Sequence, residues 1–167
     1  MVEIAEESEL LSGSGSSPHL QGFLTKSGIQ TQAKSTDPVP DAVYKAMVKV
    51  MTTGQATPNA YVTNPLDWQD VRLLRTSDGI YIWGNPSDAG PERIWGLQVV
   101  QAQAMTENTG VVGDFANFSE LAIRQGVTTD IGYVNDDFSK GRQTFRCQIR
   151  AALIWYRATA FCTVTSI

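Results

Sequence analysis

The chain has few of the side chains that most often build catalytic and metal centres. Its 167 residues include one histidine, His19, and two cysteines, Cys147 and Cys162. These positions lack the spacing of a metal-ligand set, so we expect no metal site and no cofactor. Both cysteines lie in apolar stretches, where cysteine behaves as a small hydrophobic residue. We therefore expect reduced thiols, with Cys147 in the core, and no disulfide.

Charged residues are also scarce, at 18% of the chain, and the net charge is −4. An acidic balance argues against a nucleic-acid partner, because phosphate contacts need clustered lysine and arginine. No apolar run approaches the roughly 20 residues of a membrane helix. The start, MVEIAEESEL, lacks the basic and apolar regions of a signal peptide. We expect a cytoplasmic protein with no membrane partner.

Two segments have the pattern of helices. After a linker over Thr31–Pro40, apolar residues from Asp41 recur at helical spacing until about Thr52. Asn64-Pro65 predicts the start of the second helix, because asparagine is a preferred helix cap and proline is favoured at the first helical position. Turn residues predict that this helix ends near Arg75.

Several short segments have the pattern of strands. Gln125-Gly126 is expected to form the hairpin turn between the last two of them. The expected strands are Tyr61–Thr63, Ile80–Trp83, a strand from Ile94 centred on Val99, Val111–Phe115, Leu121–Arg124 and Val127–Ile131. The expected helices and strands do not alternate in a regular βαβ order. This order predicts an α+β fold with a mixed or antiparallel central sheet and two or more packed helices.

The strongest periodicity lies in the last third of the chain. Side chains alternate from Thr144 to Trp155 with a period of two, which predicts one long strand. The second face of this strand changes from polar to apolar at Ala152, so we expect its second half to be covered on both faces. A further β-rich run follows Arg157.

None of the reactive residues forms a convincing catalytic set. The stretch SGSGSSPH has neither the Lys-Ser/Thr ending of a phosphate loop nor a preceding strand, so it is interpreted as a plain loop. A nucleophile built from His19 and Cys147 or Cys162 stays open as a hydrolase alternative. Asp67, Asp70 and Asp78 lie near each other and could do acid–base chemistry, but helix capping explains Asp67 and turn formation explains Asp78. Asp136 and Asp137 are interpreted as solvated carboxylates of a turn. We therefore expect no catalytic, cofactor-binding or metal-binding residue and no enzyme.

Arginines and aromatic residues leave two further expectations. Arg142, Arg146, Arg150 and Arg157 line the long strand region. They either pair with acidic groups of a neighbouring strand or subunit, or form a basic stripe for an anionic partner. The larger aromatic residues are expected in the core or as anchors. They are Trp68, Trp83, Trp95, Trp155, Phe115 and Phe118.

The segment YVTNPLDWQDVRLLRTSDGIYI, residues 61–82, resembles the tailed-phage major capsid proteins of the Hong Kong 97-type fold. The segments RIWGLQVV, VVGDF and RQGVTTDI, and the closing stretch to Phe161, also resemble that family in order and spacing. ELLSGSGSSPHLQGFL resembles its Leu-Leu-x-Gly-x-Gly element. Some members form a Lys–Asn isopeptide bond, but Gly141 stands where the asparagine would fall, so that chemistry is not expected.

This resemblance implies a carboxy-terminal portion of a capsid subunit, because family members are longer and begin with an arm, a hairpin loop and a spine helix. Residues 1–36 would be a remnant of the peripheral domain with its connector, residues 37–150 the axial domain, and residues 151–167 strands returning toward the peripheral domain. The implied function is self-assembly into pentamers and hexamers of a virion capsid in the bacterial cytoplasm.

The resemblance also implies contacts and alternatives. The loops Asn85–Glu92 and Thr106–Gly110 are the expected contacts with neighbouring copies. Alone, the chain would be a monomer or a weak oligomer. A nanocompartment shell protein of the encapsulin type is the main alternative, because it shares the fold.

Overall fold

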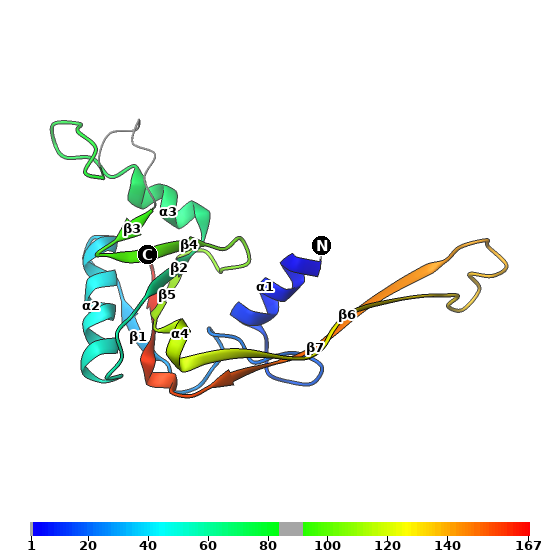
Figure 1. Cartoon of the computed structure of the whole chain (residues 1–167). Helices are drawn as coiled ribbons and strands as arrows, with labels where there is room; N and C mark the ends of the chain where they lie inside the picture. Colours follow the sequence, from blue (N-terminus) through cyan, green and yellow to red (C-terminus); the bar gives the residue numbers. More distant parts are fainter. Residues whose placement is uncertain (1, 84–91) are drawn as a thin grey trace.

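The computed structural model describes residues 2–83 and 92–167, with side chains described from residue 5 onward. A six-stranded mixed sheet forms the body, and a two-stranded ribbon projects from it (Figure 1). The elements are α1 (Val2–Ser12), β1 (Gln30–Ala33), α2 (Val39–Thr52), β2 (Ala60–Thr63), α3 (Pro65–Arg72), β3 (Arg93–Ile94), β4 (Leu97–Gln101), β5 (Thr109–Gly113), α4 (Phe115–Phe118), β6 (Ser119–Gly132), β7 (Thr144–Trp155), a 3₁₀ turn (Ala158–Ala160) and β8 (Phe161–Thr165). The predicted α+β class and mixed sheet are confirmed.

The sheet has the strand order β1-β8-β5-β2-β4-β3. Strand pairs β1/β8 and β2/β4 are parallel, and the other three pairs are antiparallel. Its edge strand β1 comes from early in the chain and its neighbour β8 from the end. Strands from the first fifth and the last residues of the chain therefore form one side of the sheet together.

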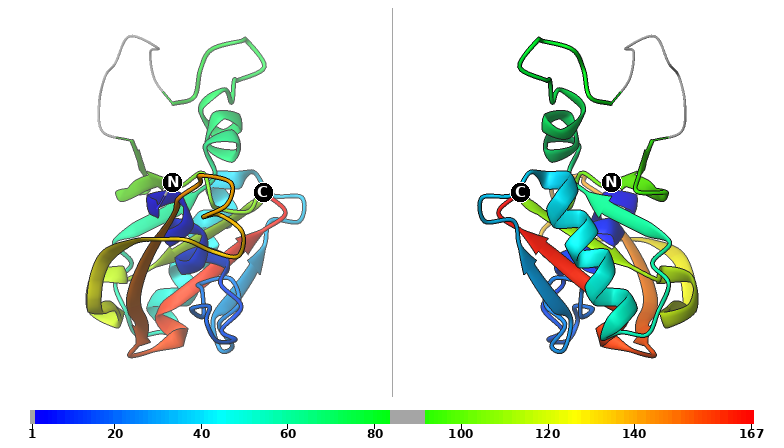
Figure 2. Two further views of the ribbon diagram at one scale, coloured as in Figure 1. Left: turned by 90° about the vertical axis from the view of Figure 1, so that its right-hand side faces the viewer. Right: turned by 90° about the vertical axis from the view of Figure 1, so that its left-hand side faces the viewer.

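Helix α2 covers the half of the sheet made by β1, β8 and β5, on the face that Figure 2 shows at right. Its buried residues are Ala42, Val43, Ala46, Met47 and Val50, which confirms the predicted helical spacing. The helix begins at Val39, two residues before the predicted start. Pro40 is compatible with this because the first turn of a helix needs no backbone N–H partner there.

The linker predicted over Thr31–Pro40 is wrong at its beginning, because residues 31–33 belong to β1. Their backbone pairs in parallel with Thr163–Thr165. The sequence QTQA shows no apolar alternation, so only the partner strand reveals this element.

Asn64 caps α3 as predicted, since its side-chain oxygen accepts the N–H of Leu66 at 2.9 Å. The helix ends at Arg72, three residues before the predicted end. The strand predicted over Ile80–Trp83 is wrong. A single bridge joins Arg75 to Tyr81, and the Arg75 guanidinium lies 4.3 Å from the Tyr81 ring centroid. Because one isolated bridge is the whole pairing described for this segment, it forms a turn and not a strand.

The hairpin predicted at Gln125-Gly126 is also wrong, because β6 runs unbroken for 14 residues beside β7. The register shifts between Ile123 and Gln125 and again between Gln125 and Thr128. The extra residues are therefore absorbed as bulges, which bend and twist a strand without ending it.

The long strand predicted over residues 144–155 is confirmed as β7, but its predicted burial is wrong. It lies in the ribbon, where Ala152 and Ile154 are exposed and their neighbours are only half-buried. Cys147 is exposed for the same reason, contrary to its predicted place in the core. Trp95 is also exposed rather than part of the core, whereas Trp68 is buried as expected.

Candidate assembly surface

The ribbon of β6 and β7 presents apolar side chains to solvent along most of its length. The exposed large apolar residues of these two strands are Leu121, Ile123, Val127, Ile131, Phe145 and Ile154. A two-stranded ribbon is at best marginally stable in water on its own, and large exposed apolar patches mark interaction sites. The ribbon is therefore a surface suited to burial against other protein.

An aromatic cluster of Phe23, Phe115, Trp155 and Phe161 fixes the base of the ribbon to the body. The ring centroid of Phe23 lies 5.1 Å from Phe115, 4.4 Å from Trp155 and 5.3 Å from Phe161. These residues come from the connector, α4, β7 and β8, so one packed cluster joins four parts of the chain.

Arg157 adds a polar anchor beside this aromatic cluster. Its guanidinium donates to the carbonyl oxygen of Gly54 at 2.9 Å and lies 4.9 Å from the Phe118 ring centroid. The arginine thus ties the end of the ribbon to the segment after α2. The direction in which the ribbon leaves the body is fixed by contacts on both sides of its base.

Asp114 is a structural position in this anchor that the sequence interpretation missed. It is buried and caps α4, accepting the N–H of Asn117 at 3.2 Å and the Asn117 side-chain amide at 2.8 and 3.0 Å. Asn59 lies beside it and accepts the N–H of Phe115 at 3.2 Å. The signal was present, since Asp114 precedes this helical turn and aspartate is a preferred cap.

The turn at the tip of the ribbon is held by Asp137. Its carboxylate accepts the hydroxyl of Thr144 at 2.6 Å and the N–H of Val134 at 3.0 Å. These hydrogen bonds lower the pKa of Asp137, because they stabilise its charged form. Phe138 stands exposed at this tip, edge-on to Tyr133 at 5.7 Å between ring centroids.

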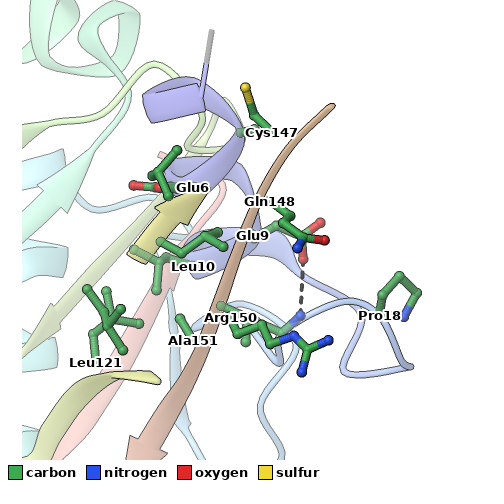
Figure 3. Close-up of a pocket in the computed structure, with 14 residues that line it drawn as sticks. Glu6, Glu9, Leu10, Pro18, Leu121, Cys147, Gln148, Arg150 and Ala151 are labelled. Atoms are coloured by element: carbon green, nitrogen blue, oxygen red, sulfur yellow. Dashed lines mark hydrogen bonds between the residues drawn. The ribbon is translucent and has the colours of Figure 1, made fainter. Parts of the chain in front are cut away.

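A groove of about 540 Å³ separates α1 from the ribbon (Figure 3). Its walls are mainly apolar, and Arg150, Glu6 and Glu9 lie at its polar positions. Glu9 accepts the backbone N–H of Leu20 at 3.2 Å, drawn as a dashed line, and contacts His19 Nδ1 at 2.7 Å. The glycine–serine connector is thus fastened to α1.

Close packing explains a glycine in this connector. A Cβ at Gly13 would lie 2.3 Å from the carbonyl oxygen of Leu20 and 2.4 Å from that of Glu9. Both atoms belong to the backbone and cannot move aside cheaply. The glycine–serine run therefore serves as a tight connector between helix and sheet.

The hydrolase residues are not brought together. His19 contacts Glu9 and borders a small hollow beside Ser12 and Ser14, whereas Cys147 faces the groove with its Sγ 3.5 Å from the hydroxyl of Thr129. Cys162 is buried in β8, and burial raises the pKa of its thiol to about 11.

No group of three or more His, Cys, Asp or Glu side chains within residues 2–83 and 92–167 has a metal-binding arrangement. No helix in these ranges combines the length and the apolar character needed to cross a membrane.

The arginines divide between the two interpretations. Arg146 pairs with Asp130 across the ribbon at 2.9 Å, and Arg157 binds a backbone carbonyl. In the part of the chain that the structure describes, Arg142 and Arg150 make no ion pair. Pairing within the chain therefore accounts for one arginine of the four, and Arg142 and Arg150 remain available to another molecule.

The predicted contact loops are placed in part. Asn108 takes a left-handed conformation with φ 60°, and its N–H is accepted by Asp67 at 3.0 Å. Thr109 and Gly110 already belong to β5. Residues 85–91 of the other predicted loop lie outside the described residues.

The chain shares its fold with solved capsid and shell proteins. The capsid of an empty GTA particle matches it with a TM-score of 0.75 at 21% identity, over 96% of this chain and 60% of that one. The holo-SrpI encapsulin complex from Synechococcus elongatus PCC 7942 matches with a TM-score of 0.63 at 13% identity, over 99% and 61%.

The family follows from the sequence itself. The model of the phage capsid family matches residues 2–166, so the chain belongs to the phage capsid family. It is 32% identical over 162 residues to the major capsid protein of Enterobacteria phage HK97. That match covers 95% of this chain but only 42% of the relative, so the chain spans less than half of the relative's length.

Proposed function

We propose that this chain is a structural part of a tailed-phage or prophage icosahedral capsid and acts by self-assembly rather than by catalysis. The observation that carries the proposal is the projecting ribbon of β6 and β7, whose large apolar side chains are exposed in the described part of a single copy. Family membership supplies the partner, because the relative at 32% identity is a major capsid protein. Other copies of the same subunit would bury this surface in the virion, after assembly in the host cytoplasm.

The proposal includes a division of the chain into three parts. Residues 1–36 belong to the peripheral domain and connector, 37–150 to the axial domain and 151–167 to the strands that return. The middle part contains α2, α3 and four strands of the six-stranded sheet. Strands β1 and β8 from the flanking parts complete one side of that sheet.

Without the remaining length of the subunit, the chain is proposed to be a monomer or a weak oligomer. Light scattering during size-exclusion chromatography measures this directly. A mass near the 18.2 kDa of one chain at low concentration supports the proposal, and a stable large shell built from this chain alone contradicts it.

The test of function is the composition of particles released by the bacterium that carries the gene. Trypsin cleaves after Arg93 and Arg124, which releases residues 94–124 as one characteristic peptide. We expect mass spectrometry to find this peptide as a major component of particles that contain nuclease-protected DNA. Its absence from such particles contradicts the proposal, and its presence in shells filled with a protein cargo favours the encapsulin alternative.

A further inference from the structure

Helix α2 buries one face against the sheet and leaves an apolar stripe on the other. Tyr44, Val48 and Met51 lie at positions i, i+4 and i+7, and each is exposed by about two-fifths or more. A helix on the surface of an isolated domain carries polar side chains on that face. This α2 stripe, defined by these three residues, therefore has no cover within the described chain.

Trp95 enlarges the α2 stripe with a second aromatic ring. Its ring centroid lies 5.1 Å from that of Tyr44, and its indole N–H donates to the carbonyl oxygen of Pro40 at 2.8 Å. The side chain is nevertheless 52% exposed and sits on a left-handed backbone with φ 50°. Tryptophan and tyrosine rings that are exposed at a surface, but fixed in position by their neighbours, are typical anchors of protein interfaces.

Helix α3 carries a second uncovered stripe. Leu66 and Leu73 lie seven residues apart, at the beginning of the helix and just beyond its end, and are 55% and 50% exposed. Gln69 and Asp70 lie between them on the same face and are also exposed. This α3 stripe contains no aromatic residue, unlike the α2 stripe, but the two stripes are similar in length.

The two stripes have fringes of opposite charge. Lys45 follows Tyr44 of the α2 stripe, and Arg93 lies two residues before Trp95; both are exposed. Lys45 pairs with Asp37, and Asp41 also lies in the first turn of α2. Lys49 donates to the carbonyl oxygen of Thr31 in β1 at 2.7 Å. Arg93 is exposed and pairs with no carboxylate in the described part of the chain.

The α3 stripe has an acidic fringe. Asp70 and Glu107 lie close enough to Asp67 to raise its pKa, together with the larger effect of burial. Such a cluster of carboxylates is stabilised when a cation approaches it. Arg93, beside the α2 stripe of a neighbouring copy, would supply that cation.

We propose that the α2 stripe of one copy packs against the α3 stripe of the next copy. The contact is heterologous, since the two stripes are different surfaces of one subunit, so it repeats head to tail and closes into a ring when the rotation allows. Helix α2 stands against one side of the sheet and α3 at the end of β2 (Figure 1), which leaves both accessible to neighbours. This inference rests on the proposed capsid function and names the surfaces that its copies share.

Disulfide trapping tests the contact. In a Cys147→Ser background, one chain carries Val48→Cys and another carries Leu66→Cys. Under mild oxidation we expect the mixture to form a covalent dimer, and neither chain alone to do so. A chain with both substitutions should give a ladder beyond dimers. Val48→Cys paired with Thr36→Cys, which is exposed outside both stripes, is the matched control.

The trapping is performed both on the concentrated chain and on particles from the bacterium, so that two failures can be told apart. Particles that contain the variants but show no link between positions 48 and 66 overturn the contact and leave the capsid function intact. Particles that lack the protein overturn the function itself. Efficient dimers of Val48→Cys alone indicate a symmetric α2 contact and also overturn the proposal.

Trp95→Ala measures how much the anchor contributes. Loss of an aromatic hot spot costs about 2 kcal/mol or more, so we expect roughly 30-fold weaker association in the trapping experiment. Ile80→Ala, which removes a side chain that is 67% exposed outside both stripes and outside the ribbon, should leave the 48–66 link unchanged. Equal effects of the two substitutions would contradict a specific role for Trp95.

Discussion

Gly113, at the end of β5, shows how closely the sheet packs against the base of the ribbon. A Cβ at this position would lie 2.3 Å from Cδ1 of Phe161 and 3.1 Å from the carbonyl oxygen of Ala160. Phe161 is fully buried within the aromatic cluster and cannot swing away. Close packing at this single residue therefore couples the central sheet to the ribbon.

Gly113→Ala is expected to lower the free energy of unfolding by about 1–3 kcal/mol, the usual cost of overpacking a core. Denaturant unfolding measures the change. Gly126→Ala is the control, because no atom lies within 4 Å of its Cβ and its backbone is not left-handed. A loss at position 126 as large as at position 113 would contradict this account.

Asp67 predicts a pH dependence of stability. Burial raises its pKa in the folded chain, so the folded state binds the proton more tightly than the unfolded state. The contribution of Asp67 to stability is therefore fully present below its unfolded pKa and is lost as the pH rises through its folded pKa. Asp67→Asn removes this loss and keeps an oxygen for the N–H of Asn108.

Unfolding of both proteins between pH 3 and pH 7 measures this effect. The stability of Asp67→Asn relative to the parent is expected to rise with pH across the range just above the ordinary aspartate pKa. A constant difference at all pH values would show that Asp67 titrates normally.

The two thiols are expected to differ in reactivity. A thiol reagent at neutral pH should modify one group in the folded chain, Cys147, because it is exposed, while Cys162 is buried with a pKa of about 11. Cys147→Ser should abolish the modification, and denaturant should reveal Cys162. Rapid modification of Cys162 in the folded chain would mean that β8 opens.

Single residues could be predicted from sequence where their chemistry is local. Asn64 caps α3 because its side chain reaches a backbone N–H two residues away. Trp95 and Cys147 could not be placed in this way. Both belong to apolar stretches, and only the tertiary structure shows that one lies on the outer surface and the other in a projecting ribbon.

At the scale of elements, the aromatic cluster at the ribbon base is the joint on which the arrangement depends. Phe23 is 7% exposed and touches rings from α4, β7 and β8. Phe23→Ala is expected to cost about 3–5 kcal/mol of unfolding free energy, as for other buried phenylalanines.

Phe138→Ala provides the matched control for Phe23→Ala. Phe138 is 80% exposed at the other end of the ribbon, so its loss should change stability by no more than about 0.5 kcal/mol. Thermal or denaturant unfolding compares the two. Similar losses for both variants would mean that the cluster at the base is not what holds the ribbon.

Helices and strands could be predicted where their own apolar residues follow a helical or strand period. They were predicted wrongly where pairing with another strand determines the structure. The spacing of apolar residues located α2, and the alternation located β7. The dipeptide Gln125-Gly126 has the composition of a turn, yet β7 offers a continuous partner and β6 runs through it with two bulges. Strand β1 exists because β8 pairs with it, which no property of its own four residues indicates.

For the whole molecule, the family and the α+β class could be recognised from motifs in the sequence, because their order and spacing persist at 32% identity. The assembly surface could not be located in this way. Exposed apolar stripes have the same residue pattern as buried ones, and only the packed structure separates the covered face of α2 from its uncovered face.

Hydrogen exchange tests most directly whether these surfaces are completed by other copies. The same chain is compared free in solution and within purified particles, with exchange read peptide by peptide. We predict strong additional protection in β6, β7 and α2 within particles, and little change in β5 and β8, which are already buried. Equal exchange of the ribbon in both states would contradict the account, because it would mean that no neighbour covers it.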